Sequence, residues 1–221
     1  MSQYLLRLYH LTMLTQKGRG LGLKMTDINV SALHFDHKLG LFGDYESKSN
    51  IIKISEVKDL TIVQIAKFKK SQVNIDQIKI DNLSLPISYP EVSHNNNLRI
   101  LWTGPDTWIC VSQNSSTLDE IKKYCNDNDF GITDLSHSRA VVQIQGDQSI
   151  DVLKKGSPFN FNQDNFSVNN SANTSYNGIN VMIDYLNDNP KTFNIYSLRS
   201  FGGSFYHSIT DSALEYGYEG I

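Results

Sequence analysis

The order of strand and helix patterns repeats along this chain, and the repeat limits its possible folds more than any other feature. Leu60–Ile65 and Arg139–Ile144 are both predicted strands, because apolar and β-branched residues dominate each of them. Each strand opens a predicted β-α-β-β-α unit, so a helix is expected after it. The segment Ser71–Ile80 follows the first of these strands, and the repeat therefore favours a helix there although its apolar spacing is ambiguous. Such a unit leaves one sheet face uncovered, so we expect two units to pack as one compact α+β body with a cleft at their interface.

The sequence divides into three expected regions. Residues 1–50 form an N-terminal extension and arm that is partly disordered, residues 51–130 the first α+β unit and residues 131–221 the second. Within the first region, Met1–Lys24 joins an apolar-rich stretch to a basic run, which is the pattern of neither a signal peptide nor a membrane span. Met25 would serve as a second start, so we expect Met1–Lys24 to be an upstream extension that is poorly packed or absent in the native protein.

Turn and cap residues place the hairpins and helices within the two units. A capping box formed by Thr117 and Glu120 predicts a helix start in the first unit. In the second unit, Gly146–Asp147 caps a helix that stops at Gly156, and Ser200 caps the last helix. Each unit also has one predicted hairpin around a turn rich in Gly, Pro, Asn or Asp. The paired strands are Leu98–Trp102 with Thr107–Val111 and Ile179–Tyr185 with Thr192–Tyr196.

The segment Asp134–Arg139 places Asp, Ser, His and Arg side chains directly before a predicted strand, which raises a catalytic hypothesis. In a Ser-His-Asp triad the imidazole lies within about 2.6 to 3.2 Å of both the hydroxyl and the carboxylate. Ser136 and His137 are sequence neighbours, and their side chains point apart in an extended segment. The sequence also lacks the Gly-x-Ser-x-Gly turn of many hydrolases. We therefore do not expect hydrolase chemistry here.

Two other interpretations of this segment stay open. In the structural one, Asp134 and Ser136 bond backbone amides in the turn before the strand, and Arg139 pairs with a nearby carboxylate or carbonyl. In the functional one, the segment at the strand entrance docks to a partner subunit. A strand-to-helix junction near residues 199–201 joins that surface, although Phe201 is favoured as a core residue. The candidate interface residues are Asp134, Ser136, His137, Arg139, Arg199 and Phe201.

Charge and cysteine content exclude several classes of partner. The 221 residues contain 20 Lys and Arg against 23 Asp and Glu, so the net charge of −3 provides no basic field for nucleic acid. Cys110 and Cys125 fit neither a disulfide framework nor a metal site, and we expect both to be buried thiols in a reducing compartment such as the cytoplasm. His34 and His37 lack a third ligand nearby, so no metal site is expected there.

Five segments carry a family resemblance. They are Trp102–Trp108, Thr133–Arg139, Gly146–Asp147, Val152–Pro158 and Leu198–Phe201. Their order and spacing resemble those of the gamma subunit of heterotetrameric sarcosine oxidase, from about residue 60 to residue 217. That family is in turn related in fold to the folate-binding aminomethyltransferases of glycine cleavage, so the resemblance implies an aminomethyltransferase-like fold.

The resemblance implies a non-catalytic, structural subunit of an enzyme that oxidises sarcosine to glycine, passes the one-carbon unit to tetrahydrofolate and forms hydrogen peroxide. FAD, FMN, NAD, zinc and tetrahydrofolate would then bind to the alpha, beta and delta partner subunits, with no cofactor, nucleic acid or membrane bound by this chain. In folate-using relatives a catalytic Asp lies where a Gly-rich turn enters a strand. The matching stretch Gly178–Ile183 has no carboxylate until Asp184, which disfavours folate chemistry in this chain. A folate-binding transferase acting alone is kept as the alternative.

Overall fold

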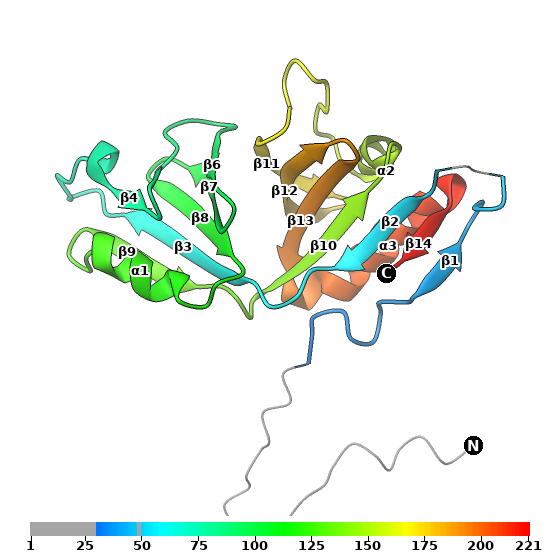
Figure 1. Ribbon diagram of the computed structural model, residues 1–221, viewed down its shortest axis with the longest axis horizontal. Coiled ribbons are helices and arrows are strands. Elements are labelled where there is room, and N and C mark those ends of the chain that lie inside the picture. Colours follow the sequence, from blue (N-terminus) through cyan, green and yellow to red (C-terminus); the bar gives the residue numbers. More distant parts are fainter. Residues whose placement is uncertain (1–29, 48–49) are drawn as a thin grey trace, which may run out of the picture. The chain divides into compact units, whose positions relative to one another are not determined.

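The computed structural model describes residues 30–47 and 50–221, of which residues 31–221 form one compact unit. The described residues form a seven-stranded sheet, a five-stranded sheet and a short two-stranded hairpin (Figure 1). The predictions made for Met1–Lys24 and for a start at Met25 lie outside the described residues. No helix in the described part of the chain is long and apolar enough to cross a membrane.

The seven-stranded sheet is antiparallel except where β14 runs alongside β2. Helices α2 (Ser149–Gly156) and α3 (Gly202–Ala213) contribute to the core on one face, where Leu153 and Phe205 pack in one buried cluster with Val142. In spatial order the strands are β1 (Gly40–Phe42), β14 (Tyr218–Gly220), β2 (Ile52–Glu56), β10 (Arg139–Gln145), β13 (Lys191–Leu198), β12 (Ile179–Asp188) and β11 (Ser171–Tyr176).

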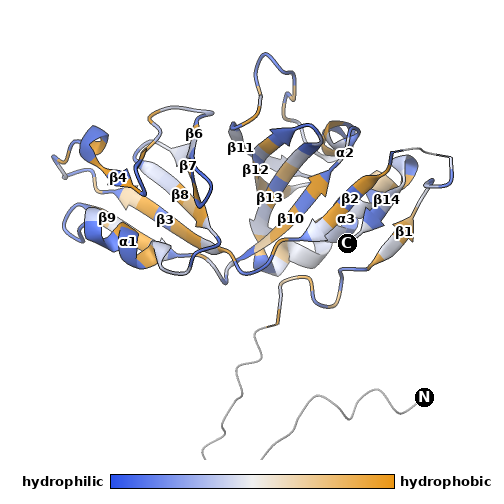
Figure 2. Cartoon of the chain, in the orientation of Figure 1, coloured by the Kyte–Doolittle hydropathy of each residue, from blue (hydrophilic) through white to orange (hydrophobic). Residues whose placement is uncertain are grey.

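The five-stranded sheet has its own core under α1 (Thr117–Tyr124), which buries Ile121 against the sheet. Cys110 and Cys125 are both fully buried in that core, as the sequence predicts. Hydrophobic residues follow the central strands of both sheets, most visibly along β3 and β10 (Figure 2). In spatial order the strands are β6 (Val92–His94), β7 (Leu98–Gly104), β8 (Thr107–Ser112), β3 (Thr61–Lys67) and β9 (Phe130–Asp134), and the short hairpin is β4 (Lys79–Ile80) with β5 (Leu83–Ser84).

The chain passes between the two sheets at two neighbouring places. Strand β2 pairs with β10 in the seven-stranded sheet, and the next strand, β3, lies in the five-stranded sheet. Strand β9 pairs with β3, and the next strand, β10, returns to the seven-stranded sheet. The two crossings are fixed by backbone hydrogen bonds from Leu135 N to Ile62 O (2.7 Å) and from Val57 N to Val141 O (2.9 Å). Each sheet is therefore completed by a strand that leads directly into the other.

The α+β class agrees with the structure, and both predicted strands are present, since Thr61–Ile65 lies on β3 and Arg139–Ile144 lies on β10. The equivalence of these two strands as the openings of a repeated unit stays a prediction. Both predicted hairpins are also present, as β7 with β8 and as β12 with β13. The order within the units differs from the prediction, because three strands, β11 to β13, follow α2 before α3 begins. The proposed boundary between residues 130 and 131 stays a prediction.

The predicted helix over Ser71–Ile80 is wrong. This segment contains only a single 3₁₀ turn, Ile75–Gln77, followed by strand β4. The Asn74 side chain accepts a hydrogen bond from Asp76 N at 3.0 Å, which favours a local turn over continuous helix. Ile78 and Ile80 are buried in the core of the five-stranded sheet, so tertiary packing holds them in an extended segment.

The observed N-caps differ from the predicted ones by one or two residues. The cap of α1 is Ser116, whose side chain makes no capping bond, and the Asn114 side chain instead accepts from Ser116 N at 3.0 Å. The predicted capping box is therefore wrong. Helix α2 is preceded by Gln148, and α3 begins only after a 3₁₀ turn over Arg199–Phe201. An Asx-type turn at Asn114 takes the place of the predicted cap of α1, and the 3₁₀ turn takes the place of the predicted cap of α3.

Candidate functional site at the junction of the two sheets

Asp134 and Ser136 hold the second crossing turn through side-chain hydrogen bonds. Asp134 Oδ1 accepts from Ser136 N at 2.9 Å and from Ser136 Oγ at 2.6 Å. Ser136 Oγ in turn accepts from Ile62 N at 3.0 Å, across to the first crossing. These bonds from Ser136 hold the pKa of Asp134 below its ordinary value. The Ser136 hydroxyl therefore donates to a carboxylate within a turn, which is the structural arrangement expected for these two residues.

The turn between β9 and β10 and the strand-to-helix junction at residues 199–201, both singled out from the sequence, lie side by side. Arg139 is the first residue of β10 and pairs with Leu198, the last residue of β13. Arg199 N donates to Ser138 O at 2.9 Å. Leu198 is 42% exposed and Phe201 is 48% exposed. The expectation that Phe201 belongs to the core is therefore wrong, because the buried apolar face of α3 begins at Phe205, which is fully buried.

Arg139 carries a half-buried positive charge. Its Nη1 atom lies 3.4 Å from Ser138 O and 3.3 Å from Ser138 Oγ, both long contacts. No ion pair joins Arg139 to a carboxylate within residues 30–47 and 50–221. Burial lowers the pKa of its guanidinium from the ordinary value. Of the two predicted partners, the carbonyl is therefore present and the carboxylate is not. His137 lies beside it in the turn and is exposed.

A cleft of about 780 Å³ opens between the two sheets and includes Arg139 in its wall. The five-stranded sheet contributes residues from β3, β7 and β8, and the seven-stranded sheet contributes residues from β10 to β13. Arg139 is the single charged residue among the described residues that line it. Polar amides, hydroxyls and apolar side chains make up the rest of the wall. The lining residues are Gln64, Thr103, Ile109, Arg139, Asn173, Thr174, Ser175, Asn180, Val181, Met182, Tyr196, Ser197 and Leu198.

The two sheets are joined elsewhere by a buried ion pair. Arg99 Nε donates to Asp184 Oδ2 at 2.7 Å, and Arg99 Nη2 donates to Asp184 Oδ1 at 2.6 Å. Asp184 is fully buried; burial raises the pKa of its carboxyl group, and the bonds from Arg99 oppose that rise. The sequence patterns did not predict this pair. Its signal was a charged residue between apolar neighbours in each strand, Arg99 between Leu98 and Ile100 and Asp184 between Ile183 and Tyr185.

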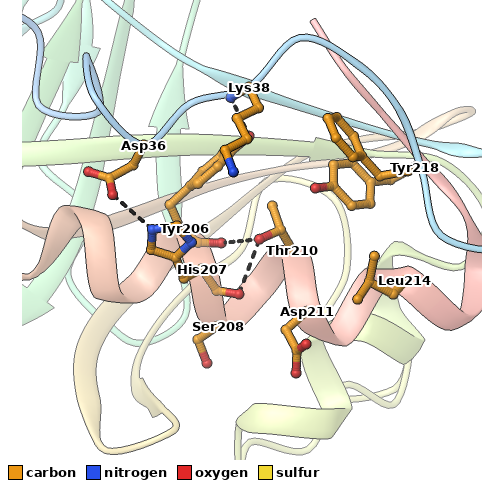
Figure 3. A pocket seen from close by; sticks show the side chains of 10 residues that line it. Asp36, Lys38, Tyr206, His207, Ser208, Thr210, Asp211, Leu214 and Tyr218 are labelled. Atoms are coloured by element: carbon orange, nitrogen blue, oxygen red, sulfur yellow. Dashed lines mark hydrogen bonds and ion pairs between the residues drawn. The ribbon is translucent and has the colours of Figure 1, made fainter. Parts of the chain in front are cut away.

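A second cavity, of about 510 Å³, lies beside α3 (Figure 3). In it, His207 Nε2 and Asp36 Oδ1 are 2.8 Å apart, so the helix is joined to the preceding arm. Lys38 N donates to Tyr206 Oη at 3.4 Å, a second link between the same elements. Across the described residues, no group of three or more His, Cys, Asp or Glu side chains is placed to hold a metal ion.

Comparison with solved structures defines the class of fold. A chain of heterotetrameric sarcosine oxidase from Corynebacterium sp. U-96, in complex with pyrrole 2-carboxylate, matches with a TM-score of 0.69 and 24% identity, over 75% of this chain and 85% of that one. Glycine cleavage system aminomethyltransferase T from Bartonella henselae matches with a TM-score of 0.53 and 12% identity, over 72% of this chain and 45% of that one. The chain therefore has the fold that these two proteins share.

Sequence comparison leads to one particular relative. The chain is 26% identical over 136 residues to sarcosine oxidase subunit gamma from Corynebacterium sp. (strain U-96). The match covers 61% of this chain and spans 65% of the length of that relative. No family model matches the sequence. The resemblance to sarcosine oxidase gamma subunits that the sequence motifs indicated is confirmed.

Proposed function

We propose that this chain is the gamma-type subunit of a heterotetrameric sarcosine oxidase and that it stabilises the assembly. One observation supports this proposal above the others: the sequence comparison and the fold comparison both lead to sarcosine oxidase from the same bacterium. The fold match extends over 85% of the solved chain, which leaves little of that chain without a counterpart here.

In this proposal the chemistry belongs to the partner subunits. The assembly oxidises sarcosine to glycine, passes the one-carbon unit to tetrahydrofolate and forms hydrogen peroxide. FAD, FMN, NAD, zinc and tetrahydrofolate bind to the alpha, beta and delta subunits. The state of the candidate catalytic side chains in this chain supports a structural role. Both carboxylate oxygens of Asp184 accept bonds from Arg99, and Ser136 and Asp134 bond each other within a turn.

The docking surface that we propose combines the turn between β9 and β10 with the strand-to-helix junction that follows β13. It consists of Asp134, Ser136, His137, Arg139, Leu198, Arg199 and Phe201. Two exposed apolar side chains, Leu198 and Phe201, provide area that a partner subunit would remove from water. Arg139 provides a charge beside them. Asp134 and Ser136 serve this surface indirectly, because their hydrogen bonds set the shape of the turn.

Co-expression tests this proposal. The tagged full chain is expressed with candidate alpha, beta and delta subunits, and the purified material is assayed for co-purification and for sarcosine-dependent hydrogen peroxide formation. We expect the subunits to co-purify, and the assembled oxidase to lose thermal stability when this chain is omitted. If the partner subunits never co-purify with it, and their activity and stability are the same without it, the proposal is wrong.

The alternative is a folate-binding one-carbon transferase that acts alone. The similarity in fold to aminomethyltransferase T and the cleft between the sheets favour it. Calorimetric titration of the purified chain with tetrahydrofolate tests it. Tryptophan fluorescence is a weaker probe, since Trp108 is buried on the helix-facing side of its sheet and donates to Pro86 O at 2.7 Å. Saturable binding and transferase activity without partners would support this alternative over the subunit role.

A further inference from the structure

We infer that the cleft between the two sheets receives an acidic segment of a partner subunit, with a partner carboxylate bound to Arg139. This inference rests on the proposed function, because it requires a partner to dock at the junction of the sheets. Beyond the proposed function, it states which part of the partner occupies the cleft and which chemical group binds Arg139.

The charge of the cleft is the first observation. Its wall contains Arg139 and no Asp, Glu or Lys among the described residues, so its formal charge is positive. A half-buried guanidinium without a carboxylate partner has lost part of its hydration and gained little in return. Charge-assisted bonds to a carboxylate would satisfy it, and guanidinium and carboxylate groups match in geometry. An acidic group is therefore the complementary occupant.

The arrangement of polar side chains around Arg139 is the second observation. Arg139 pairs with Leu198, and on the next strand Asn180 directly precedes Val181, which pairs with Ser197. Asn180 therefore follows Leu198 in a row that runs across the sheet from Arg139. Ser175 of β11 pairs with Asn180 and extends the row. The row offers amide and hydroxyl donors beyond the guanidinium, which suits an extended backbone or a second acidic side chain.

The rim of the cleft indicates a polypeptide occupant. Leu198 lines the cleft and is 42% exposed, and Phe201, three residues further along, is 48% exposed. A small molecule inside the cleft would leave Phe201, which is not part of the lining, in water. A polypeptide that covers the proposed docking surface would bury both side chains and place an acidic residue over Arg139 at the same time. Arg139 and Leu198 belong to both surfaces, so the cleft is continuous with that interface.

The test uses the full chain and the co-expressed candidate subunits. Arg139→Gln removes the charge, and Arg139→Lys retains it without the forked geometry. Lys123→Gln, an exposed position on α1, removes one charge far from the cleft in sequence and serves as the control. Dissociation constants for the partner subunits are measured at low and high salt, with thermal unfolding to confirm that each variant folds.

We expect Arg139→Gln to weaken binding by about thirtyfold, the lower end of the effect of truncating one member of a buried charge pair, because Arg139 is only half-buried. Arg139→Lys should recover part of the loss, and Lys123→Gln should bind as the wild type does. A second variant, Asn180→Asp, places a carboxylate in the same row at an exposed position and should weaken binding even if Arg139→Gln fails to fold.

The outcomes separate the two proposals. If the wild-type chain binds no candidate subunit, the proposed function fails. If the wild type binds but Arg139→Gln and Asn180→Asp both match Lys123→Gln, the function stands and the cleft inference is overturned. Glutarate at millimolar concentration serves as a small-molecule probe of the cleft. The inference is equally overturned if glutarate binds the isolated chain through Arg139 but its presence leaves the dissociation constants for the partner subunits unchanged.

Discussion

Arg99 and Asp184 form a two-bond ion pair between strands of different sheets, and the Asp184 side chain has no exposed surface. Arg99 also donates from Nη1 to Asn169 Oδ1 at 3.2 Å, so the guanidinium is well supplied with acceptors. Burying a carboxylate fully costs it its hydration, and only hydrogen bonds to such a counter-charge offset that cost. The pair therefore fixes which rows of the two sheets face each other.

Replacing Asp184 with Asn should strongly destabilise the fold. The substitution keeps the side-chain size but leaves Arg99 largely buried without its counter-charge, and breaking a buried pair in this way costs about 3 to 5 kcal/mol. The free energy of unfolding is measured by urea denaturation at neutral pH. Asp164→Asn, an exposed position for which no side-chain bond is observed, is the control and should stay near the wild type. Equal stability of both variants would contradict the structural importance of the pair.

The crossing turn should respond to acid through Asp134. Hydrogen bonds from Ser136 lower the folded-state pKa of Asp134 below that of the unfolded chain, so its contribution to stability is present above the unfolded value and is lost as the pH falls through the folded one. Asp134→Asn should therefore be less stable than the wild type at neutral pH. The difference should shrink steadily as the pH is lowered from about 5 towards 2.

Urea midpoints measured across that pH range for both proteins check this prediction. Asp164→Asn, examined in parallel, should show no comparable change in its difference from the wild type. A difference that stays constant with pH would mean that the Ser136–Asp134 bonds do not favour the ionised carboxylate.

Among the secondary-structure elements, α2 and β11 show how closely helix and sheet can approach. Gly156, the last residue of α2, lies so near the Tyr176 ring that an added Cβ would be 2.5 Å from ring atoms. The Tyr176 hydroxyl donates to Val152 O at 3.0 Å, one turn earlier in the same helix. Tyr176 is fully buried, so its ring has no open space into which it can move. Gly156 is therefore required here for close packing between helix and sheet.

Gly156→Ala should destabilise the protein through this contact. Overpacking in a close-packed core costs about 1 to 3 kcal/mol, because neighbouring side chains are forced away from their preferred rotamers. Thermal unfolding measures the effect. Gly104→Ala is the matched control, since an added Cβ there meets no atom within 4 Å. If the two variants unfold at the same temperature, the packing against Tyr176 is less restrictive than the structure indicates.

At the scale of the whole molecule, the exchange of strands ties the two sheets into one folding unit. Strand β2 precedes β3 in sequence but completes the sheet of β10, and β9 precedes β10 but completes the sheet of β3. A third buried cluster fills the space between the sheets, with contributions from Ile62, Ile109, Val141 and Met182. Neither half can bury its apolar residues fully without the other.

Separate fragments covering residues 50–130 and 131–221 should accordingly fail to fold alone. The first fragment lacks both strands that pair with β2, namely β10 and β14, and the second lacks β2, which lies between them. Circular dichroism and hydrogen exchange would follow the fragments singly and after mixing, and we expect protected amides only in the mixture. The full chain is the reference for both fragments. A fragment that folds cooperatively alone would show that its half of the molecule is an independent domain.

Local patterns in the sequence were sufficient for the elements whose form depends on neighbouring residues. The hairpins around Gly104–Asp106 and Asn187–Pro190 follow from turn chemistry, and the strands of β3 and β10 follow from β-branched composition. The turn at Asp134 and Ser136 was also predictable, because short polar side chains bond backbone groups a few residues away. The segment Ser71–Ile80 was not, since its apolar spacing fits neither period and the core decides its form.

The sequence by itself therefore determined the α+β class, the hairpins, the buried cysteines and the resemblance to sarcosine oxidase gamma subunits. Only the tertiary structure decided which strands pair across the two halves, that Arg99 meets Asp184, that Phe201 is exposed, and that Arg139 lines a cleft. The physical reason is one of distance along the chain. Turn and strand preferences act between near neighbours, whereas strand partners and buried charge pairs depend on residues brought together from far apart in the sequence, such as Arg99 and Asp184.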